Sequence, residues 1–462
     1  MVLKKFFGDR AFYRRMFTIA LPIMIQNGIT NFVSLLDNIM VGQLGTVQMN
    51  GVTISNQLLF VFNLCLFGMM SGAGIFTAQY HGSKDDEGVR FTFRYKLMAA
   101  VLLAAVGALV FSVFGRTLIS LFLRGEGSPE DAAASLALGY EYLLIMLIGI
   151  LPFAFSNAYS STLRETGQTV VPMIGGVSAI IVNLALNYIL IFGHFGAPKM
   201  GIAGAAVATV VSRYVELAVV AGWTHTHGAK KPFIKGAYRS LRIPAHLFRQ
   251  ILIKGSPLLV NEFLYSAGIT IMNQSYSIRS LDVVAAQNIS GTLYNLSSVV
   301  FMAIGSAVGI LIGQMQGRGA PAEVIRDEDR KMITASVLSC TVFGGIMAAL
   351  SGVFPLMYNT TDSVRSIATQ LICVNAIIMP FNAFTHASYF TIRSGGKTLL
   401  TFLFDSGYMW AVSVPLAFCL SRFTAIPIVP LFLVCNMTDL FKCAIGLWML
   451  KRGTWIKNLT AG

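Results

Sequence analysis

The chain has 462 residues, of which 55% are hydrophobic and only 12% charged, and its net charge is +14. So few charged side chains could not cover the surface of a water-soluble protein of this length, so the composition excludes a soluble domain and predicts an integral membrane protein. The basic residues gather in particular loops, which indicates membrane topology as the origin of the positive charge; we expect no nucleic-acid partner.

Twelve apolar segments follow one another along the chain, and each is long enough to cross the roughly 30 Å hydrocarbon core of a bilayer as a helix. They lie near residues 14–41, 50–79, 95–116, 133–158, 168–193, 202–223, 250–277, 284–315, 331–352, 364–390, 398–420 and 426–449. Most of the 34 Lys and Arg residues fall in loops on the side of the N-terminus, which the positive-inside rule assigns to the cytoplasm. We therefore expect an all-α, multi-pass protein of the plasma (inner) membrane with both termini cytoplasmic.

The first segment contains the stretch FVSLLDNIMVG (32–42), whose single carboxylate is Asp37. It is the only charged residue between Arg15 and Lys84. A charged carboxylate at bilayer depth costs roughly 2.5–3.5 kcal/mol on insertion scales, so one that is kept there usually faces a cavity and serves the movement of ions or substrates. We predict a functional rather than a structural role for Asp37.

The fifth segment carries two amides, Asn183 and Asn187, and no charge. A spacing of four residues puts both on one face of a helix. Their carbonyl oxygens could coordinate a cation or hold Asp37, and hydrogen bonding between helices is an equally supported alternative. Two amides and a carboxylate suit a hard monovalent cation or a shared proton network. In the sixth segment, Arg213 and Glu216 are spaced to neutralise each other.

A basic loop lies halfway along the chain, with seven Lys and Arg residues between Lys230 and Lys254. We interpret it as a cytoplasmic linker with an interfacial amphipathic stretch. It divides the chain into an N-lobe of helices 1–6 (residues 1–224), a linker (225–249) and a C-lobe of helices 7–12 (250–462).

The two lobes resemble each other in sequence. Pro22 matches Pro257, VTISNQL (52–58) matches QNISGTL (287–293), and GIFTAQYHG (74–82) matches GILIGQMQG (309–317), all at a constant separation of 235 residues. A six-helix unit has therefore been duplicated. Because six is even, both copies enter from the same side, and we expect an axis along the membrane normal with a central cleft between the lobes.

Two isolated acids lie in the second lobe. Glu262 is the only charged residue between Lys254 and Arg279, and we favour a functional role for it. Asp405 is a weaker candidate, because pairing with a neighbouring helix would explain it equally well. The position that matches Glu262 in the first lobe is Asn27, which leaves room for a separate site in each lobe.

Motifs for catalysis are missing from the sequence. The stretch RSGGKT (393–398) has Thr391 where a phosphate-binding loop requires glycine, and no strand precedes it. The six cysteines stand singly, without the spacing of metal sites or disulfide frameworks. We expect neither an enzyme nor a cofactor.

Five stretches together resemble a known family, the multidrug and toxic compound extrusion (MATE) transporters, within the larger group that includes lipid-linked oligosaccharide flippases. They are ALPIMIQN…LLDNIMVGQLG, GAGIFTAQYHGSKD, STLRETGQTVVPM, NLALNYILIFG and GIAGAAVATVVSR. The resemblance spans nearly the whole chain. It implies efflux of cationic and amphipathic compounds in exchange for protons or sodium ions.

The resemblance also implies site residues. The family's acid in the first helix falls on Asp37, its two polar positions in the fifth helix on Asn183 and Asn187, and a threonine of the sixth on Thr209; these four would hold Na⁺ if that is the coupling ion. At the second of these fifth-helix positions, one bacterial branch of the family has aspartate and another has asparagine; with Asn187, this chain resembles the asparagine branch. Glu262 lies about one turn nearer its helix's proline than the glutamate of that branch, and the aspartate of that branch's Gly-x-x-Lys-Asp-Thr-like stretch is absent from this chain.

The hypothesis that follows is antiport by competition. Burial favours the neutral or ion-paired form of a carboxylate, which links ion binding at Asp37 to substrate binding. The partners would be small cationic or amphipathic organic molecules and the lipid bilayer, and we expect a monomer. The first alternative is a flippase for a lipid-linked or polar-headgroup substrate, which predicts several basic residues in the cleft; Arg213 is nearly the only basic residue within a span. A structural or receptor-like protein would leave Asp37 and Glu262 without a use.

Overall fold

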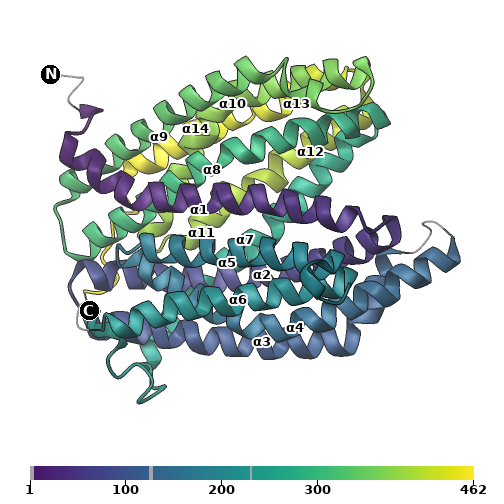
Figure 1. Cartoon of the computed structure of the whole chain (residues 1–462). Coiled ribbons are helices and arrows are strands. Elements are labelled where there is room, and N and C mark those ends of the chain that lie inside the picture. The colour runs from purple at the N-terminus through teal and green to yellow at the C-terminus, as the bar shows by residue number, and fades with distance from the viewer. Residues whose placement is uncertain (1–4, 124–127, 229–230, 462) are drawn as a thin grey trace. The chain divides into compact units, whose positions relative to one another are not determined.

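The structure is a computed structural model that describes residues 5–123, 128–228 and 231–461, without the side chains of Leu35 and Asn38 (Figure 1). Every regular element in this described part is helical. Its α-helices are α1 (Arg10–Gly42), α2 (Thr46–Gly82), α3 (Asp86–Phe122), α4 (Pro129–Glu165), α5 (Val170–Phe192), α6 (Gly201–Thr226), α7 (Ala245–Ser277), α8 (Leu281–Gly317), α9 (Ala322–Leu350), α10 (Asp362–Ser394), α11 (Thr398–Phe402), α12 (Val414–Phe423), α13 (Ile428–Met437) and α14 (Asp439–Arg452). Short helical turns lie at η2 (His194–Gly196), η3 (Pro232–Ile234) and η4 (Phe354–Met357), and two π-helical turns, η5 (Leu403–Gly407) and η6 (Met409–Ser413), join α11 to α12.

The prediction of an all-helical membrane protein is confirmed. Within the described residues, 11 helical segments are long and apolar enough to cross a membrane; Thr398–Phe423 forms one of them and Ile428–Arg452 another. The remaining predicted span is α7, which has 33 residues but carries the charged Arg249, Lys254 and Glu262. With α7 counted, the helices are the twelve expected from the sequence.

The sequence repeat reappears in the helices. The helices α1 and α7 both have 33 residues and an internal proline, Pro22 in one and Pro257 in the other. The next pair, α2 and α8, both have 37 residues. Since the bounds of both pairs are separated by the same 235 residues as the matched motifs, the duplicated sequence folds into duplicated helices.

The chain forms two compact units. Unit 1 comprises Met1–Met24, Ala78–Asp85 and Leu252–Gly462, and unit 2 comprises Ile25–Thr77 and Asp86–Ile251. The lobe limits predicted at 224 and 250 stay a prediction, and so does the basic linker (225–249), of which residues 229–230 lie outside the described residues.

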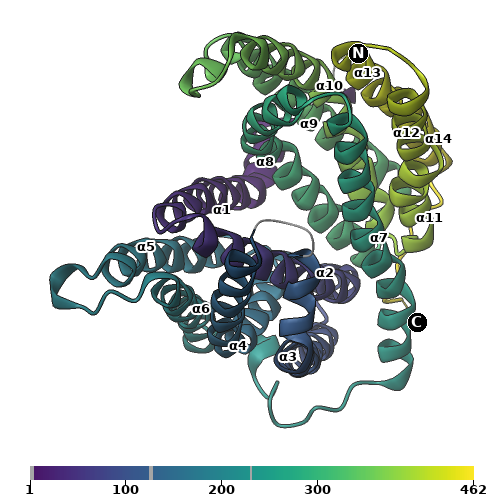
Figure 2. The ribbon, with the colours of Figure 1, turned by 90° about the vertical axis from the view of Figure 1, so that its right-hand side faces the viewer.

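Unit 2 is held together by close helix contacts at small residues. In this unit α6 packs on α5 and α4, and α4 packs on α3 (Figures 1 and 2). At Gly204 of α6, a Cβ atom would lie 2.8 Å from the backbone of Leu190 in α5. Ser55 of α2 donates a hydrogen bond to the backbone oxygen of Gly139 in α4 at 2.8 Å. Small residues of this kind allow membrane helices to approach each other closely.

Unit 1 is built around α8, which contacts both α9 and α10. Its buried core includes Ile304, Val308 and Ile312 of α8, and Met16 from the N-terminal half of α1 packs into the same cluster. The ends of α2 and α8 cross so closely that Gly82 lies against the backbone of Gln314 and Gly317 against that of Gln79. These four residues correspond to each other in the repeat, because both pairs are separated by 235 residues.

Residues 453–461 form a C-terminal strap that follows α14. Its Trp455 is only 1% exposed. The side-chain amide of Gln79 donates to the backbone oxygens of Ser394 (2.9 Å) and Lys457 (3.1 Å), and its oxygen accepts from the backbone nitrogen of Leu459 (2.6 Å). The strap therefore joins the end of α2 to the end of α10 within unit 1.

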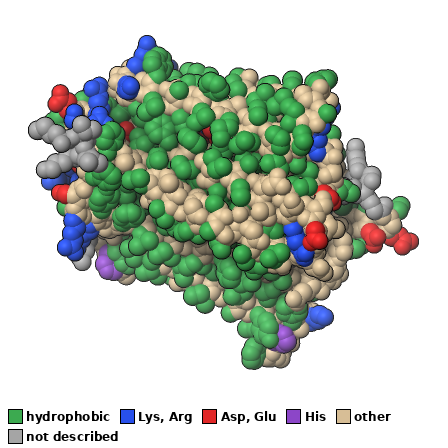
Figure 3. Space-filling view, turned by 90° about the horizontal axis from the view of Figure 1, so that it is seen from above, with side chains coloured by type: hydrophobic (Ala, Val, Ile, Leu, Met, Phe, Trp, Pro, Cys, Tyr) green, Lys and Arg blue, Asp and Glu red, His purple; other side chains and the backbone are tan. Residues whose placement is uncertain are grey.

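The outer surface of the helices is apolar. The face in Figure 3 is largely covered by hydrophobic side chains, and its Lys and Arg side chains lie toward the edges. Leu109, Val113 and Ile148 each expose 60% or more of their surface. Exposed apolar surface of this extent is compatible with lipid and not with water, which agrees with a multi-pass membrane protein.

Candidate functional site

The four predicted residues of the first lobe lie together in unit 2. Asp37 comes from α1, Asn183 and Asn187 from α5, and Thr209 from α6. The spacing of four residues puts both asparagines on the inward face of α5, where they are 6% and 2% exposed. Three helices thus supply one polar cluster.

Hydrogen bonds connect the members of this cluster. The Asn187 amide donates to Oδ1 of Asp37 at 2.8 Å and to Oδ1 of Asn183 at 3.2 Å. The Asn183 amide nitrogen lies 3.2 Å from the hydroxyl of Thr209, which donates to the backbone oxygen of Ala205 at 3.0 Å. Asp37 therefore has a neutral amide, rather than a basic side chain, as its direct partner.

The side-chain amides of Asn183 and Asn187 can form further polar contacts. With the Asn183 amide reversed, its nitrogen lies 3.0 Å from Oδ2 of Asp37 and its oxygen accepts from Thr209. The oxygen Oδ1 of Asn187 is buried and has no hydrogen-bond partner among the described residues. Leaving a buried acceptor unsatisfied costs about 1–3 kcal/mol, which a bound cation or proton donor would offset. Carboxylate, amide and hydroxyl oxygens are the donor set that a hard cation prefers.

A cavity of about 310 Å³ opens beside the cluster in unit 2. Asp37, Asn187 and Thr209 line it, together with Tyr142 and Arg213. The sequence places Arg213 in a pair with Glu216, and this ion pair is confirmed at 3.6 Å. The sequence does not show that Arg213 lines the cavity beside Asp37. There, the guanidinium carbon of Arg213 lies 4.2 Å from the centre of the Phe153 ring.

In the second lobe, Asp405 is the predicted acid that accepts hydrogen bonds from other side chains. Lys442 of α14 donates to Oδ1 of Asp405 at 2.7 Å, and Asn261 of α7 donates to Oδ2 at 3.1 Å. Asn261 is itself fixed by Ser406, whose hydroxyl donates to its amide oxygen at 2.8 Å. Asp405 lies in the π-helical turn η5, a type of local widening that is often found at functional sites.

Asp405 is thus paired with side chains of neighbouring helices, which is one of the two explanations that the sequence leaves open. Its two partners were not predicted. Asn261 directly precedes the more conspicuous Glu262, and Lys442 lies near the basic end of the last span. A basic residue inside a predicted span is the signal that could have identified Lys442.

Glu262 does not join this cluster through a direct bond. Within the described part of the chain its side chain forms no hydrogen bond and no ion pair, although Arg393 and Asp405 act on it electrostatically. The geometry therefore does not support the prediction that Glu262 is a stronger functional candidate than Asp405. A functional role of Glu262 stays a prediction.

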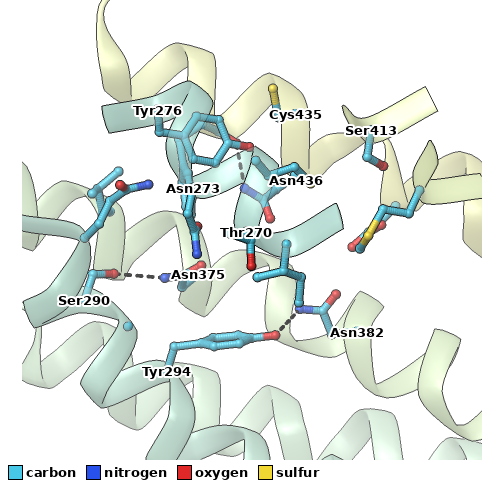
Figure 4. Close-up of a pocket in the computed structure, with 18 of the residues that line it drawn as sticks. Thr270, Asn273, Tyr276, Ser290, Tyr294, Asn375, Asn382, Ser413, Cys435 and Asn436 are labelled. Atoms are coloured by element: carbon cyan, nitrogen blue, oxygen red, sulfur yellow. Dashed lines mark hydrogen bonds between the residues drawn. The ribbon is translucent and has the colours of Figure 1, made fainter. Parts of the chain in front are cut away.

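Unit 1 contains a cavity of about 940 Å³ with a polar lining (Figure 4). Asn375 donates to the hydroxyl of Ser290 at 2.9 Å, and Asn382 donates to that of Tyr294 at 2.8 Å. Lys442 also lines this cavity, so the ion pair with Asp405 lies at its wall. The cavity is large enough for an organic molecule of drug size.

The family to which the chain belongs follows from its sequence. A family model described as MatE matches residues 22–189 and 257–419, that is, one segment in each predicted lobe. The chain therefore belongs to the multidrug and toxic compound extrusion family of transporters, which confirms the resemblance seen in its motifs.

Curated relatives match over most of their length. The chain is 25% identical over 451 residues to the probable multidrug resistance protein NorM of Thermotoga maritima, covering 96% of this chain and 93% of that protein. It is 26% identical to the probable multidrug resistance protein YoeA of Bacillus subtilis, covering 90% and 88%. It is 24% identical to the multidrug resistance protein PmpM of Pseudomonas aeruginosa, covering 89% and 84%.

Solved structures share the fold. A MATE transporter in a bent conformation matches with a TM-score of 0.84 at 18% identity, covering 98% of both chains. The MATE transporter VcmN of Vibrio cholerae in its bent form matches with a TM-score of 0.82 at 18% identity, covering 96% of this chain and 97% of the other. At this level of identity the match establishes the helical fold alone.

Proposed function

We propose that the protein is a secondary active multidrug efflux antiporter that exports cationic or amphipathic compounds in exchange for protons or sodium ions. The observation that carries the proposal is the partly buried hydrogen bond from Asn187 to Asp37 at the wall of the unit 2 cavity. A carboxylate kept inside a membrane helix and bound directly by a neutral amide can still accept a positive charge. Relatives named as multidrug resistance proteins support the export of drugs.

In this mechanism Asp37 holds the coupling ion. A proton would neutralise the carboxylate, whereas Na⁺ would bind it with help from the oxygens of Asn183, Asn187 and Thr209. Exchange follows if the ion-loaded and the empty Asp37 favour different arrangements of the protein, because the ion then shifts the equilibrium between them. Each unit charge that moves inward gains roughly 2.3 kcal/mol per 100 mV of membrane potential.

We place the protein in the plasma membrane with both termini cytoplasmic, on the basis of its loop charges. We expect it to act as a monomer without a cofactor other than the coupling ion. No nucleic acid takes part.

The flippase alternative needs basic side chains that are free to bind an anionic head group. The two basic residues at the cavity walls have acidic neighbours: Arg213 pairs with Glu216 and Lys442 pairs with Asp405. Neither offers an uncompensated positive charge, which supports the antiporter over the flippase.

The experiment that tests the proposal is ethidium efflux from proteoliposomes of the purified protein, with a proton gradient and a sodium gradient imposed in separate runs. We expect efflux to follow one of the two gradients, and that gradient identifies the ion. No efflux under either gradient would contradict the antiporter and favour the flippase.

A further inference from the structure

Three lysines of unit 1 form a cluster without an acidic partner. They are Lys254 of α7, Lys397 in the turn between α10 and α11, and Lys457 of the C-terminal strap. Lys397 and Lys457 both act electrostatically on Lys254. Among the described residues, none of the three side chains has a hydrogen bond or an ion pair. Because like charges held close together repel one another, this cluster favours the binding of an anion.

The packing of α7 against the segment 398–413 brings two of these lysines to the same level. Asn261 of α7 accepts a hydrogen bond from the hydroxyl of Ser406 at 2.8 Å, and further along Trp410 donates to the backbone oxygen of Leu264 at 2.8 Å. Since the second contact follows the first along both segments, the two run parallel, and α7 and α11 lie side by side in Figure 2. The lysines of these segments precede the first contact by seven and nine residues, which is about two to two and a half helical turns.

The C-terminal strap brings the third lysine to this place. Gln79 donates to the backbone oxygen of Lys457 at 3.1 Å, and Trp455, two residues earlier, is buried. The backbone oxygen of Trp455 lies directly against Gly395, in the turn that ends with Lys397. The backbone of Lys457 is therefore held in place while its side chain is exposed.

The helix surface beside this cluster is apolar. Ile253 and Val260 of α7 are exposed, and so are Leu399 of α11 and Leu403 of η5. Spacings of seven and four residues put the members of each pair on one face of their helix. None of the three lysines lines either of the two cavities described above, so the cluster is distinct from them. Ammonium groups next to exposed apolar side chains match the charged head and the acyl chains of a phospholipid.

We infer that Lys254, Lys397 and Lys457 bind the head group of an anionic phospholipid from the surrounding membrane. The phosphate lies among the three ammonium groups, and the acyl chains lie on the exposed apolar side chains of α7 and α11. Basic clusters between membrane helices on the cytoplasmic side are typical sites for such head groups, and the loop charges assign this end of the helices to the cytoplasm. A lipid with two phosphates, such as cardiolipin, offsets three positive charges better than a lipid with one. The inference does not depend on the proposed transport function.

The test is native mass spectrometry of the purified protein, titrated in separate runs with cardiolipin and with phosphatidylethanolamine. Phosphatidylethanolamine also has acyl chains and a phosphate, but its head group has no net charge. The spectra resolve each bound lipid and give the affinity for the first one. We expect the wild type to bind the first cardiolipin at least about tenfold more tightly than the first phosphatidylethanolamine.

Variants of the three lysines decide whether this preference comes from the cluster. The triple variant Lys254→Gln, Lys397→Gln and Lys457→Gln should bind the two lipids with nearly equal affinity. Because these side chains have no partner among the described residues, their replacement leaves no group unpaired, and thermal unfolding in lipid-free detergent should stay as in the wild type. Arginine at the same three positions keeps the charge and should retain the preference.

A matched control removes the same charge elsewhere. Lys235→Gln, Arg239→Gln and Arg242→Gln change three exposed basic residues of the basic linker in unit 2, and this variant should keep the preference for cardiolipin. Equal affinity of the wild type for both lipids, an undiminished preference in the triple lysine variant, or the same loss in the linker variant would each overturn the inference.

A competition run distinguishes a lipid from a free phosphate. Millimolar inorganic phosphate should leave the bound cardiolipin in place, because it lacks the acyl chains that contact the apolar side chains. Displacement of cardiolipin by inorganic phosphate would show that the cluster binds a soluble anion and would overturn the assignment to a lipid. None of these results depends on whether the protein transports drugs.

Discussion

The two carboxylates Asp37 and Asp405 are stabilised inside the protein in different ways. Asp405 has a lysine ammonium as a direct partner, so it already holds a positive charge that belongs to the protein. Asp37 is bound directly by a neutral amide. A buried charge is stable only when it is compensated, so Asp37 is the more suitable of the two to take up an ion from solution and release it.

The hydrogen bond from Asn187 should determine how tightly the ion binds at Asp37. Asn187→Leu keeps a side chain that branches at Cγ but removes the donor and the amide oxygen. Hydrogen bonds to charged groups contribute about 1.5–3 kcal/mol, and this one stabilises the empty, charged form of Asp37. Its loss should therefore raise the apparent affinity for a proton by about tenfold or more, whereas the affinity for Na⁺ should fall because an amide oxygen that helps to hold Na⁺ is lost. The measurement is the dependence of efflux rate on the concentration of the coupling ion.

A control for this variant is Asn157→Leu. Among the described residues, the Asn157 side chain bonds the backbone oxygen of Phe153 one turn earlier in its own helix, at 2.9 Å, and no other group. It should leave the ion dependence as in the wild type. Equal ion affinities for Asn187→Leu and the wild type would argue against a direct role of the amide.

Part of the residue-level site could be predicted from the sequence. The isolation of Asp37 and the four-residue spacing of Asn183 and Asn187 are local patterns, and the structure brings these side chains together. The pair of Asp405 and Lys442 could not be predicted, because its members lie on different helices and no sequence period relates them. Pairing across helices is a property of the packing, which the sequence does not display locally.

Among the helices, the contact between α5 and α6 depends on the absence of a side chain at Gly204. A Cβ atom there would lie 2.8 Å from the backbone of Leu190, so Gly204→Val should force the two helices apart. Overpacking of this kind costs about 1–3 kcal/mol. We expect a lower midpoint of thermal unfolding in detergent, and lower efflux because Asn187 and Thr209 sit on these two helices.

Gly222→Val in the same helix is the matched control. A Cβ atom at Gly222 meets no atom within 4 Å, so this variant should unfold near the wild-type temperature. If both valine variants unfold at the same temperature, the close approach at Gly204 is not what holds α5 against α6.

The C-terminal strap should stabilise unit 1 through Trp455. Trp455→Ala removes a fully buried ring from the core, and substitutions of this type cost about 3–5 kcal/mol. Trp448→Ala, in which the lost ring is 52% exposed on α14, should cost much less. Thermal unfolding of the two variants checks this difference, and a smaller effect at Trp455 than at Trp448 would show that the strap is dispensable. The sequence offers no sign of this strap, since a short segment after the last span has no characteristic pattern.

Across the whole molecule, composition and repeat were sufficient to predict the fold class. Twelve apolar segments and the matched motifs correspond to helices of equal length in the two copies, as α1 with α7 and α2 with α8 show. The span that falls short in apolar content is α7, because it carries three charges. Its match to α1 in the repeat supports its assignment as a span beside the apolar run at 250–277.

The central claim is that one ion site at Asp37 couples the ion gradient to export. The most direct test is ion-driven ethidium efflux by Asp37→Asn in proteoliposomes, beside Glu141→Gln, which changes an exposed acid of α4 in the same way. With equal amounts of folded protein, we predict that Asp37→Asn falls to the passive leak rate while Glu141→Gln keeps the wild-type rate. Undiminished gradient-driven efflux by Asp37→Asn would contradict the account.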